Sequence, residues 1–248
     1  MAKGLLKEAT PNSLISAANY VKRSSRAILA RGGDGARTGT TTIQRNCLIE
    51  WFKYRHEILA GNFCRQFHYF GEGAEHLVYF DLENLRAIKS THPNQFGHSV
   101  AYEGARATPL EYLRRLVYHN WFFGDDIRLL GAIIGDDHLE IITSQPWITA
   151  HQTTPQASEA QIIQYFAGIR FRKSQIYPAG ALFYSSHFNL VAADAHSRNV
   201  LVSDAGDIVA IDVVIGRPGQ PLEERLRREF PKDTPDSIQG PSTSVGIN

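Results

Sequence analysis

The sequence predicts an α+β protein. Short runs of alternating apolar residues, joined by turns rich in Gly, Asn and Asp, predict antiparallel hairpins over residues 65–89, 127–143 and 200–211. Apolar residues at helical spacing predict helices over residues 11–30, 48–59, 109–123, 158–169 and 222–230.

Composition limits the classes of protein to which the chain can belong. Its 248 residues are 43% hydrophobic, enough for one sizeable core or two small lobes. The net charge of +1 argues against a nucleic-acid partner, although residues 1–60 hold ten Lys/Arg and four Asp/Glu. That basic region either contacts phosphates or an acidic partner, or is a solvated helical face.

The chain shows no sign of a membrane or secretory protein. No apolar run approaches the length that spans a bilayer, and the N-terminus lacks the apolar core of a signal peptide. Cys47 and Cys64 lack the paired spacing of a zinc site or a disulfide framework. We therefore expect a reducing, cytoplasmic setting and no membrane contact.

Two segments are expected to lack regular structure. Residues 31–42 are rich in Gly and Thr but lack the Gly-Lys-Ser/Thr ending of a phosphate-binding P-loop, and no predicted strand precedes them. They are predicted to be a flexible linker. Residues 231–248 are rich in Pro, Ser and Asp with little to bury, and are predicted to be disordered.

The most informative stretch is residues 189–216. It places Asp194, Asn199 and Asp212 at the ends of two short apolar strands joined by a turn. Asn199 and Asp212 offer the oxygen ligands that Mg2+ prefers, and Asp194 is left to face an incoming hydroxyl. The alternative is a hairpin whose polar ends are merely solvated turns.

A second informative stretch lies upstream, in the hairpin over residues 65–89. Residues 71–78 read GEGAEHLV and match the glycine-rich loop G-x-G-x-x-G-x-V except at the third glycine, where His76 stands. Residues 87–89 read AIK and place Lys89 at a strand end. Taken alone, Lys89 could also be a solvated strand-end charge.

Together these motifs resemble the protein-kinase-like fold, in the expected order over residues 65–216. The D-A-H-S-R-N loop is similar to the D-x-H-x-x-N loop of aminoglycoside-phosphotransferase-like kinases, and the whole is most similar to the small kinase domain of phage and mobile-element polyvalent proteins. The resemblance implies a bilobal fold with an antiparallel N-lobe sheet at 65–143, a minimal C-lobe at 144–230 and an N-terminal helical extension at 1–64.

The resemblance also implies ATP and Mg2+ as cofactors and a role for each motif residue. Asp194 would be the catalytic base, and Asn199 and Asp212 would hold the metal. The ATP-binding set would be Gly71, Gly73, Val78, Lys89, Glu111, Ser144, Gln145 and Trp147. In this set Lys89 pairs with phosphates and with Glu111, and the adenine lies against the segment 144–147.

Glu111 has a second interpretation. Thr108 and Glu111 also form the pattern of a capping box, in which Glu111 serves the start of its own helix and not Lys89. The sequence leaves both roles open.

Departures from the family pattern bear on function. Ala192 and Ala193 stand before Asp194, where a regulated protein kinase has His and Arg, and Val213 and Val214 follow Asp212. Without that arginine a phosphorylated activation loop would lack its basic partner, so we expect no control of this kind. Only 36 residues follow Asp212, so we expect either that the acceptor binds elsewhere, on the N-terminal helices, or that another domain or chain completes the reduced C-lobe. The predicted function is phosphoryl transfer from ATP to a hydroxyl of a protein Ser/Thr/Tyr or of a small molecule; the alternative is a pseudokinase or nucleotide-binding interaction module.

Overall fold

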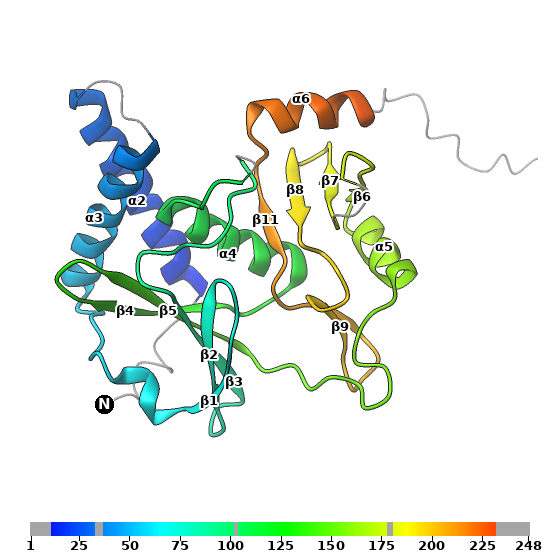
Figure 1. The fold of residues 1–248 in the computed structure, drawn as a ribbon, viewed down its shortest axis with the longest axis horizontal. Coiled ribbons are helices and arrows are strands. Elements are labelled where there is room, and N and C mark those ends of the chain that lie inside the picture. Colours follow the sequence, from blue (N-terminus) through cyan, green and yellow to red (C-terminus); the bar gives the residue numbers. More distant parts are fainter. Residues whose placement is uncertain (1–10, 33–36, 102–103, 178–180, 232–248) are drawn as a thin grey trace, which may run out of the picture.

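A five-stranded antiparallel sheet forms one half of the molecule (Figure 1). The computed structural model describes residues 11–32, 37–101, 104–177 and 181–231. The sheet has the order β1-β2-β3-β5-β4. Its strands are β1 (His68–Glu72), β2 (His76–Asp81), β3 (Arg86–Thr91), β4 (Arg128–Ile134) and β5 (Leu139–Pro146). The α+β class and these predicted strands are confirmed. We call this sheet, with the helices α2–α4 that pack on it, the N-lobe.

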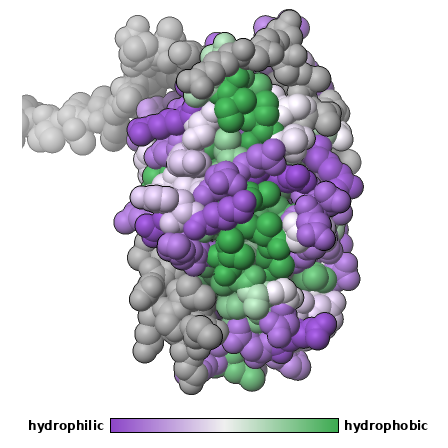
Figure 2. Space-filling view, turned by 90° about the vertical axis from the view of Figure 1, so that its left-hand side faces the viewer, coloured by the Kyte–Doolittle hydropathy of each residue, from purple (hydrophilic) through white to green (hydrophobic). Residues whose placement is uncertain are grey.

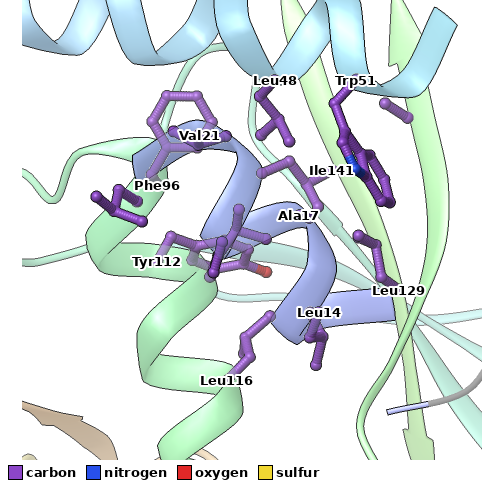
Figure 3. Packing of buried hydrophobic residues seen from close by; sticks show 14 of the residues in the cluster. Leu14, Ala17, Val21, Leu48, Trp51, Phe96, Tyr112, Leu116, Leu129 and Ile141 are labelled. Carbon is purple, nitrogen blue, oxygen red and sulfur yellow. The ribbon is translucent and has the colours of Figure 1, made fainter. Parts of the chain in front are cut away.

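Three helices build the core of the N-lobe: α2 (Pro11–Gly32), α3 (Arg37–Arg55) and α4 (Pro109–Phe123). Figure 3 shows α2 between α3 and α4, with its apolar stripe directed at both helices and at the sheet. The fully buried residues at this junction are Leu14, Ala17, Val21, Leu48, Leu113 and Ile141. The N-terminal helices are therefore part of the core that fixes the position of α4.

The predicted flexible linker at 31–42 is wrong for most of its length. Helix α2 continues to Gly32 and α3 begins at Arg37, while residues 33–36 lie outside the described part of the chain. The Gly/Thr composition was a poor guide because packing of Cys47, Leu48 and Trp51 stabilises α3 from its other end.

Helix α4 begins and ends as its sequence predicts. The Thr108 hydroxyl accepts a hydrogen bond from the Glu111 amide at 3.3 Å, and the Glu111 carboxylate accepts one from the Thr108 amide at 2.6 Å. Gly124 ends the helix with φ of 65°, a left-handed conformation that glycine adopts without a Cβ penalty. These two signals fix the length of the helix that faces the site.

The other half, the C-lobe, is made of short strands and two helices. Strands β6 (Arg172–Lys173), β7 (Phe183–Ser185), β8 (Leu190–Ala193) and β11 (Val214–Gly216) form a sheet of order β11-β8-β7-β6, and β9 (Val200–Val202) pairs with β10 (Ile208–Ala210). Helices α5 (Glu159–Gly168) and α6 (Gln220–Glu229) flank them, and a 3-10 turn, η1 (Phe63–Gln66), leads into β1. The β6-β7-β8-β11 sheet was not predicted, because strands of two to four residues show no measurable alternation.

The two lobes are tied together by the long connection between β3 and α4. An added Cβ at Gly219, the residue before α6, would lie 1.6 Å from the Ala101 carbonyl oxygen, and one at Gly216 would lie 2.6 Å from Val100 Cγ2. Helix α4 also packs directly on β11. The connection and α4 therefore hold the C-lobe against the N-lobe sheet.

The surface that carries α2 and α3 is mixed in character. Figure 2 shows apolar atoms gathered along the middle of this side, bordered by hydrophilic residues. Of the described helices, none is both long and apolar enough to cross a membrane. The predicted disorder of the tail falls, apart from residue 231, outside the described residues.

Leu48 provides a test of the N-terminal helices as core. Its side chain is fully buried in the α2–α3–α4 cluster, so Leu48→Ala is expected to lower the free energy of unfolding by about 2–5 kcal/mol. Tyr54, on the same helix and 80% exposed, is the matched control. Tyr54→Ala should change the free energy of unfolding by less than about 0.5 kcal/mol. Equal effects in urea-induced unfolding would contradict this assignment.

Candidate functional site

Two antiparallel strand pairs bring the polar residues of the segment 189–216 together. In the first pair, β8 with β11, Val214 lies opposite Ala193, so Asp194 lies beside the residues that lead into β11. In the second pair, β9 with β10, the Ile211 amide donates to the Asn199 carbonyl oxygen at 2.9 Å just beyond the last register pair. Strand pairing therefore fixes the backbone on both sides of Asp212.

The carboxylate of Asp194 is held from two sides. His196 Nε2 lies 3.0 Å from Oδ1, and Asn199 Nδ2 donates to Oδ2 at 2.9 Å. His196 Nδ1 accepts a hydrogen bond from the Arg198 amide, which holds the ring with Nε2 toward Asp194. Asp194 has φ of 57°, a left-handed conformation that aspartate tolerates. The carboxylate is thus oriented while its face remains open to solvent.

Lys89 joins the sheet to this centre. Its ammonium lies 3.6 Å from Asp212 Oδ1 and donates to the Ile211 carbonyl oxygen at 3.3 Å. The side chain of Gln145, on the neighbouring strand β5, donates to the same carbonyl at 3.2 Å. Two donors from the sheet therefore fix the peptide bond that precedes Asp212, across the boundary between the lobes.

The Asp212 carboxylate is strongly held in its ionised form. Burial of the group opposes ionisation, but the charges of Lys89 and Arg115 hold the pKa of Asp212 well below its usual range. Its side chain is 48% exposed, into the cavity described next, so water screens part of this effect. Asp212 is an anion at any physiological pH.

A cavity of about 1430 Å3 contains these residues. Such a volume exceeds that of a typical small-molecule site, which is about 300–1000 Å3. Phe70, Val78, Ala87, Gln145 and Ile148, from the N-lobe sheet and the segment that follows it, line the cavity together with Leu201 of β9. It is also lined by His98, Tyr177, Leu182, Val191, Leu222 and Arg225. Lys89 of β3 lines it too, as do Asp194, Asn199 and Asp212, which lie between the short strands of the C-lobe.

Only part of the segment 144–147, which was expected to receive the adenine, lines the cavity. Gln145 and Trp147 line the cavity, whereas Ser144 is fully buried in the sheet, where its hydroxyl accepts a hydrogen bond from Arg86. The Trp147 amide donates to the Leu85 carbonyl, so this amide already has a partner. The Trp147 ring packs against Phe70 and Phe80, with centroids 4.8 and 4.4 Å away. Trp147 therefore covers the outer edge of the cavity with its side chain.

The glycine-rich loop, residues 71–76, is only partly at the cavity. Gly73 and Val78 are among the described residues that line it, and Gly71 is not. His76, at the position of the third glycine, is directed inward and buried, with Nε2 3.0 Å from the Tyr112 hydroxyl on α4. Its side chain therefore belongs to the core beneath the loop.

Glu111 adopts the capping role. Besides the capping box with Thr108, its carboxylate accepts a hydrogen bond from the Ser99 hydroxyl at 3.0 Å. Among the ion pairs of the described residues, the acid that faces Lys89 is Asp212. The resemblance implies that Lys89 pairs with Glu111. In the structure Lys89 instead contacts Asp212, the candidate metal ligand.

The sequence interpretation missed three charged or titratable side chains beside the site. Arg115 and His119 on α4 lie behind Lys89 and Asp212, and Glu75 of the glycine-rich loop pairs with Arg115. Arg115 and His119 share the buried helical stripe of Tyr112 with spacings of three and seven residues. A charged residue at a core-facing position was the only signal in the sequence that could have pointed to them.

The residues present fit a hard divalent cation. Asn199 uses its Nδ2 to hold Asp194, which leaves its Oδ1 as an oxygen ligand beside the anionic Asp212. Mg2+ in nucleotide sites needs only one or two such side chains, with water and phosphate oxygens completing its shell. In the described part of the chain, no group of three or more His, Cys, Asp or Glu offers an alternative metal site.

Comparison with known proteins agrees with this geometry. Residues 42–216 match the family described as Serine/Threonine/Tyrosine Kinase found in polyvalent proteins. Neither a curated protein nor a solved structure matches the chain. The matched range begins within α3 and ends with β11, so it contains the whole cavity centre.

The buried His76 predicts a specific pH dependence. Burial lowers its pKa from 6.5 to about 4, so the folded protein keeps the ring neutral while the unfolded chain takes up a proton. The stability that this neutral ring contributes is present above pH 6.5 and is lost as the pH falls toward 4. The free energy of unfolding should fall by about 3 kcal/mol over this pH range because of His76.

His76→Gln is the matched variant, because a glutamine can still bond the Tyr112 hydroxyl and does not titrate. Urea unfolding of both proteins between pH 7 and 4 measures the difference. The wild type should lose more stability than His76→Gln across this window. Parallel pH profiles would show that His76 is not held neutral.

Proposed function

This chain belongs to the family of Ser/Thr/Tyr kinases found in polyvalent proteins, and we propose that it transfers the γ-phosphate of ATP to a hydroxyl group in a Mg2+-dependent reaction. The observation that carries the proposal is the convergence of Lys89, Asp194, Asn199 and Asp212 on one cavity. Phosphoryl transfer depends mostly on positioning and charge neutralisation, and this set supplies both.

Asp194 is the proposed catalytic base. Its carboxylate is oriented by His196 and Asn199 and open to the cavity, so it can accept the proton of an acceptor hydroxyl. The hydroxyl oxygen forms a bond to the γ-phosphorus, and the bond from that phosphorus to the bridging oxygen breaks. The electron pair leaves with ADP, and the proton goes to Asp194.

Lys89, Asn199 and Asp212 are the proposed ligands of the triphosphate and its metal. Lys89 would exchange its 3.6 Å contact with Asp212 for the α- and β-phosphates, and Asn199 and Asp212 would hold Mg2+. Bound there, Mg2+ would neutralise the charge that develops on the phosphate oxygens. The firmly ionised Asp212 supports this role, because a protonated carboxyl would bind the cation weakly.

The volume of the cavity supports separate places for nucleotide and acceptor, because it exceeds that of a typical small-molecule site. We assign the adenosine to the part between Phe70, Ala87 and Leu201, where apolar side chains lie on both sides. The acceptor would then enter from the part lined by Leu182, Val191 and Leu222 and meet the phosphate at Asp194.

The assay uses radiolabelled ATP, with a degenerate Ser/Thr/Tyr peptide mixture and water as acceptors. Wild type should release or transfer the label in a Mg2+-dependent manner. Asp194→Ala should reduce the rate about 10²–10⁴-fold, because it removes the base, and should keep the increase in melting temperature that MgATP produces. Asp204→Ala is the matched control, since Asp204 is an exposed aspartate in the β9–β10 turn outside the cavity.

Three outcomes would oppose the proposal in different ways. Equal rates in wild type and Asp194→Ala would exclude Asp194 as the base. Stabilisation by MgATP without transfer or hydrolysis would favour a pseudokinase or nucleotide-binding module. Absence of both stabilisation and turnover would exclude a nucleotide site altogether.

A further inference from the structure

A buried ion pair connects the glycine-rich loop to helix α4. Arg115 donates two parallel hydrogen bonds to Glu75, from Nη1 to Oε1 at 3.2 Å and from Nη2 to Oε2 at 2.6 Å. The side chains of Arg115 and Glu75 are only 7% and 12% exposed. A paired, bidentate contact of this kind fixes the relative position of the two segments that carry it.

A third segment closes on the same carboxylate. The His98 amide, in the connection between β3 and α4, donates to Glu75 Oε1 at 2.9 Å. Gly97 lies so close that an added Cβ would be 2.3 Å from Glu75 Oε1, and its φ of 77° also favours glycine. Glu75 is thus enclosed by the loop, the connection and α4, and it has little freedom to move.

The glycine-rich loop contacts α4 at a second point, one residue further along the chain. His76 Nε2 lies 3.0 Å from the Tyr112 hydroxyl, and both side chains are buried. Tyr112 and Arg115 are three residues apart on α4, so they lie on one face of the helix. Two consecutive loop residues are therefore anchored to one helical turn.

This arrangement reverses the polarity that the resemblance implies. In the kinase-like pattern, a glutamate on the helix would pair with the lysine of β3, but in this protein Glu111 caps α4 and Lys89 faces Asp212. Helix α4 instead contributes a cation, Arg115, and its carboxylate partner, Glu75, lies in the glycine-rich loop. The charge of Arg115 also helps Lys89 to keep Asp212 ionised against the opposing effect of burial.

We propose that Glu75 and Arg115 are positioning residues that hold the glycine-rich loop over the nucleotide phosphates, so that α4 acts on the phosphate site through this loop. The inference rests on the proposed function. It predicts that loss of the pair weakens binding of the triphosphate while binding of adenosine, which lacks phosphates, is retained.

The test variant is the double substitution Glu75→Gln/Arg115→Met. A single substitution would leave a buried charge without its partner and could unfold the protein, whereas the double variant removes both charges and keeps similar volumes. The glutamine oxygen can still accept the His98 amide. The matched control is Glu159→Gln/Lys173→Met, which removes an ion pair of the same charges between α5 and β6, outside the cavity.

Two measurements follow on wild type, double variant and control. Isothermal titration calorimetry gives the affinities for the Mg2+ complex of the non-hydrolysable analogue AMP-PNP and for adenosine. Hydrogen–deuterium exchange of the free proteins gives the mobility of residues 71–76. In the double variant the Kd for AMP-PNP should rise at least tenfold, the Kd for adenosine should stay within twofold, and exchange in the loop should increase at least tenfold.

The outcomes separate this inference from the proposed function. Equal loss of affinity for both ligands, unchanged affinities, or unchanged loop exchange would overturn the positioning role. If the wild type binds AMP-PNP but transfers no phosphate, the proposed transferase fails while the affinities still decide the role of the pair. Failure of the wild type to bind either ligand would overturn both.

Discussion

The pairing of β8 with β11, beside the pairing of β9 with β10, is the constraint on which the candidate site depends. Each pair is only three residues long, yet together they fix the backbone at Asp194, Asn199 and Asp212. Lys89 and Gln145, on strands of the N-lobe sheet, both donate to the Ile211 carbonyl oxygen. These two hydrogen bonds attach the N-lobe to the candidate site. A shift of either pair by one residue would turn these side chains away from one another.

The same pairing explains the departures from the usual kinase pattern. Ala192 and Ala193, which stand where a regulated kinase has His and Arg, are strand residues opposite Ile215 and Val214. The chain after Asp212 therefore continues directly as a buried strand into α6, and the described residues offer no extended segment there for a phosphate to order.

The sequence predicted those parts of the molecule whose signals are local. The capping box at Thr108, the hairpin over β9 and β10 and the strand that carries Lys89 each follow from a few neighbouring residues, and they were predicted correctly. The β6-β7-β8-β11 sheet of the C-lobe was missed because tertiary packing, and not alternation, makes its short segments strands. The Glu75–Arg115 pair joins residues 40 positions apart, so no local pattern could reveal it.

The central claim is that strand pairing builds a metal and phosphate site from Lys89, Asn199 and Asp212. A crystal structure of the protein with AMP-PNP and Mn2+, located by its anomalous scattering, tests it most directly. The account predicts a metal ion about 2.0–2.3 Å from an Asn199 oxygen and an Asp212 oxygen, with Lys89 on the phosphates. A metal bound elsewhere, or a nucleotide outside the cavity, would contradict it.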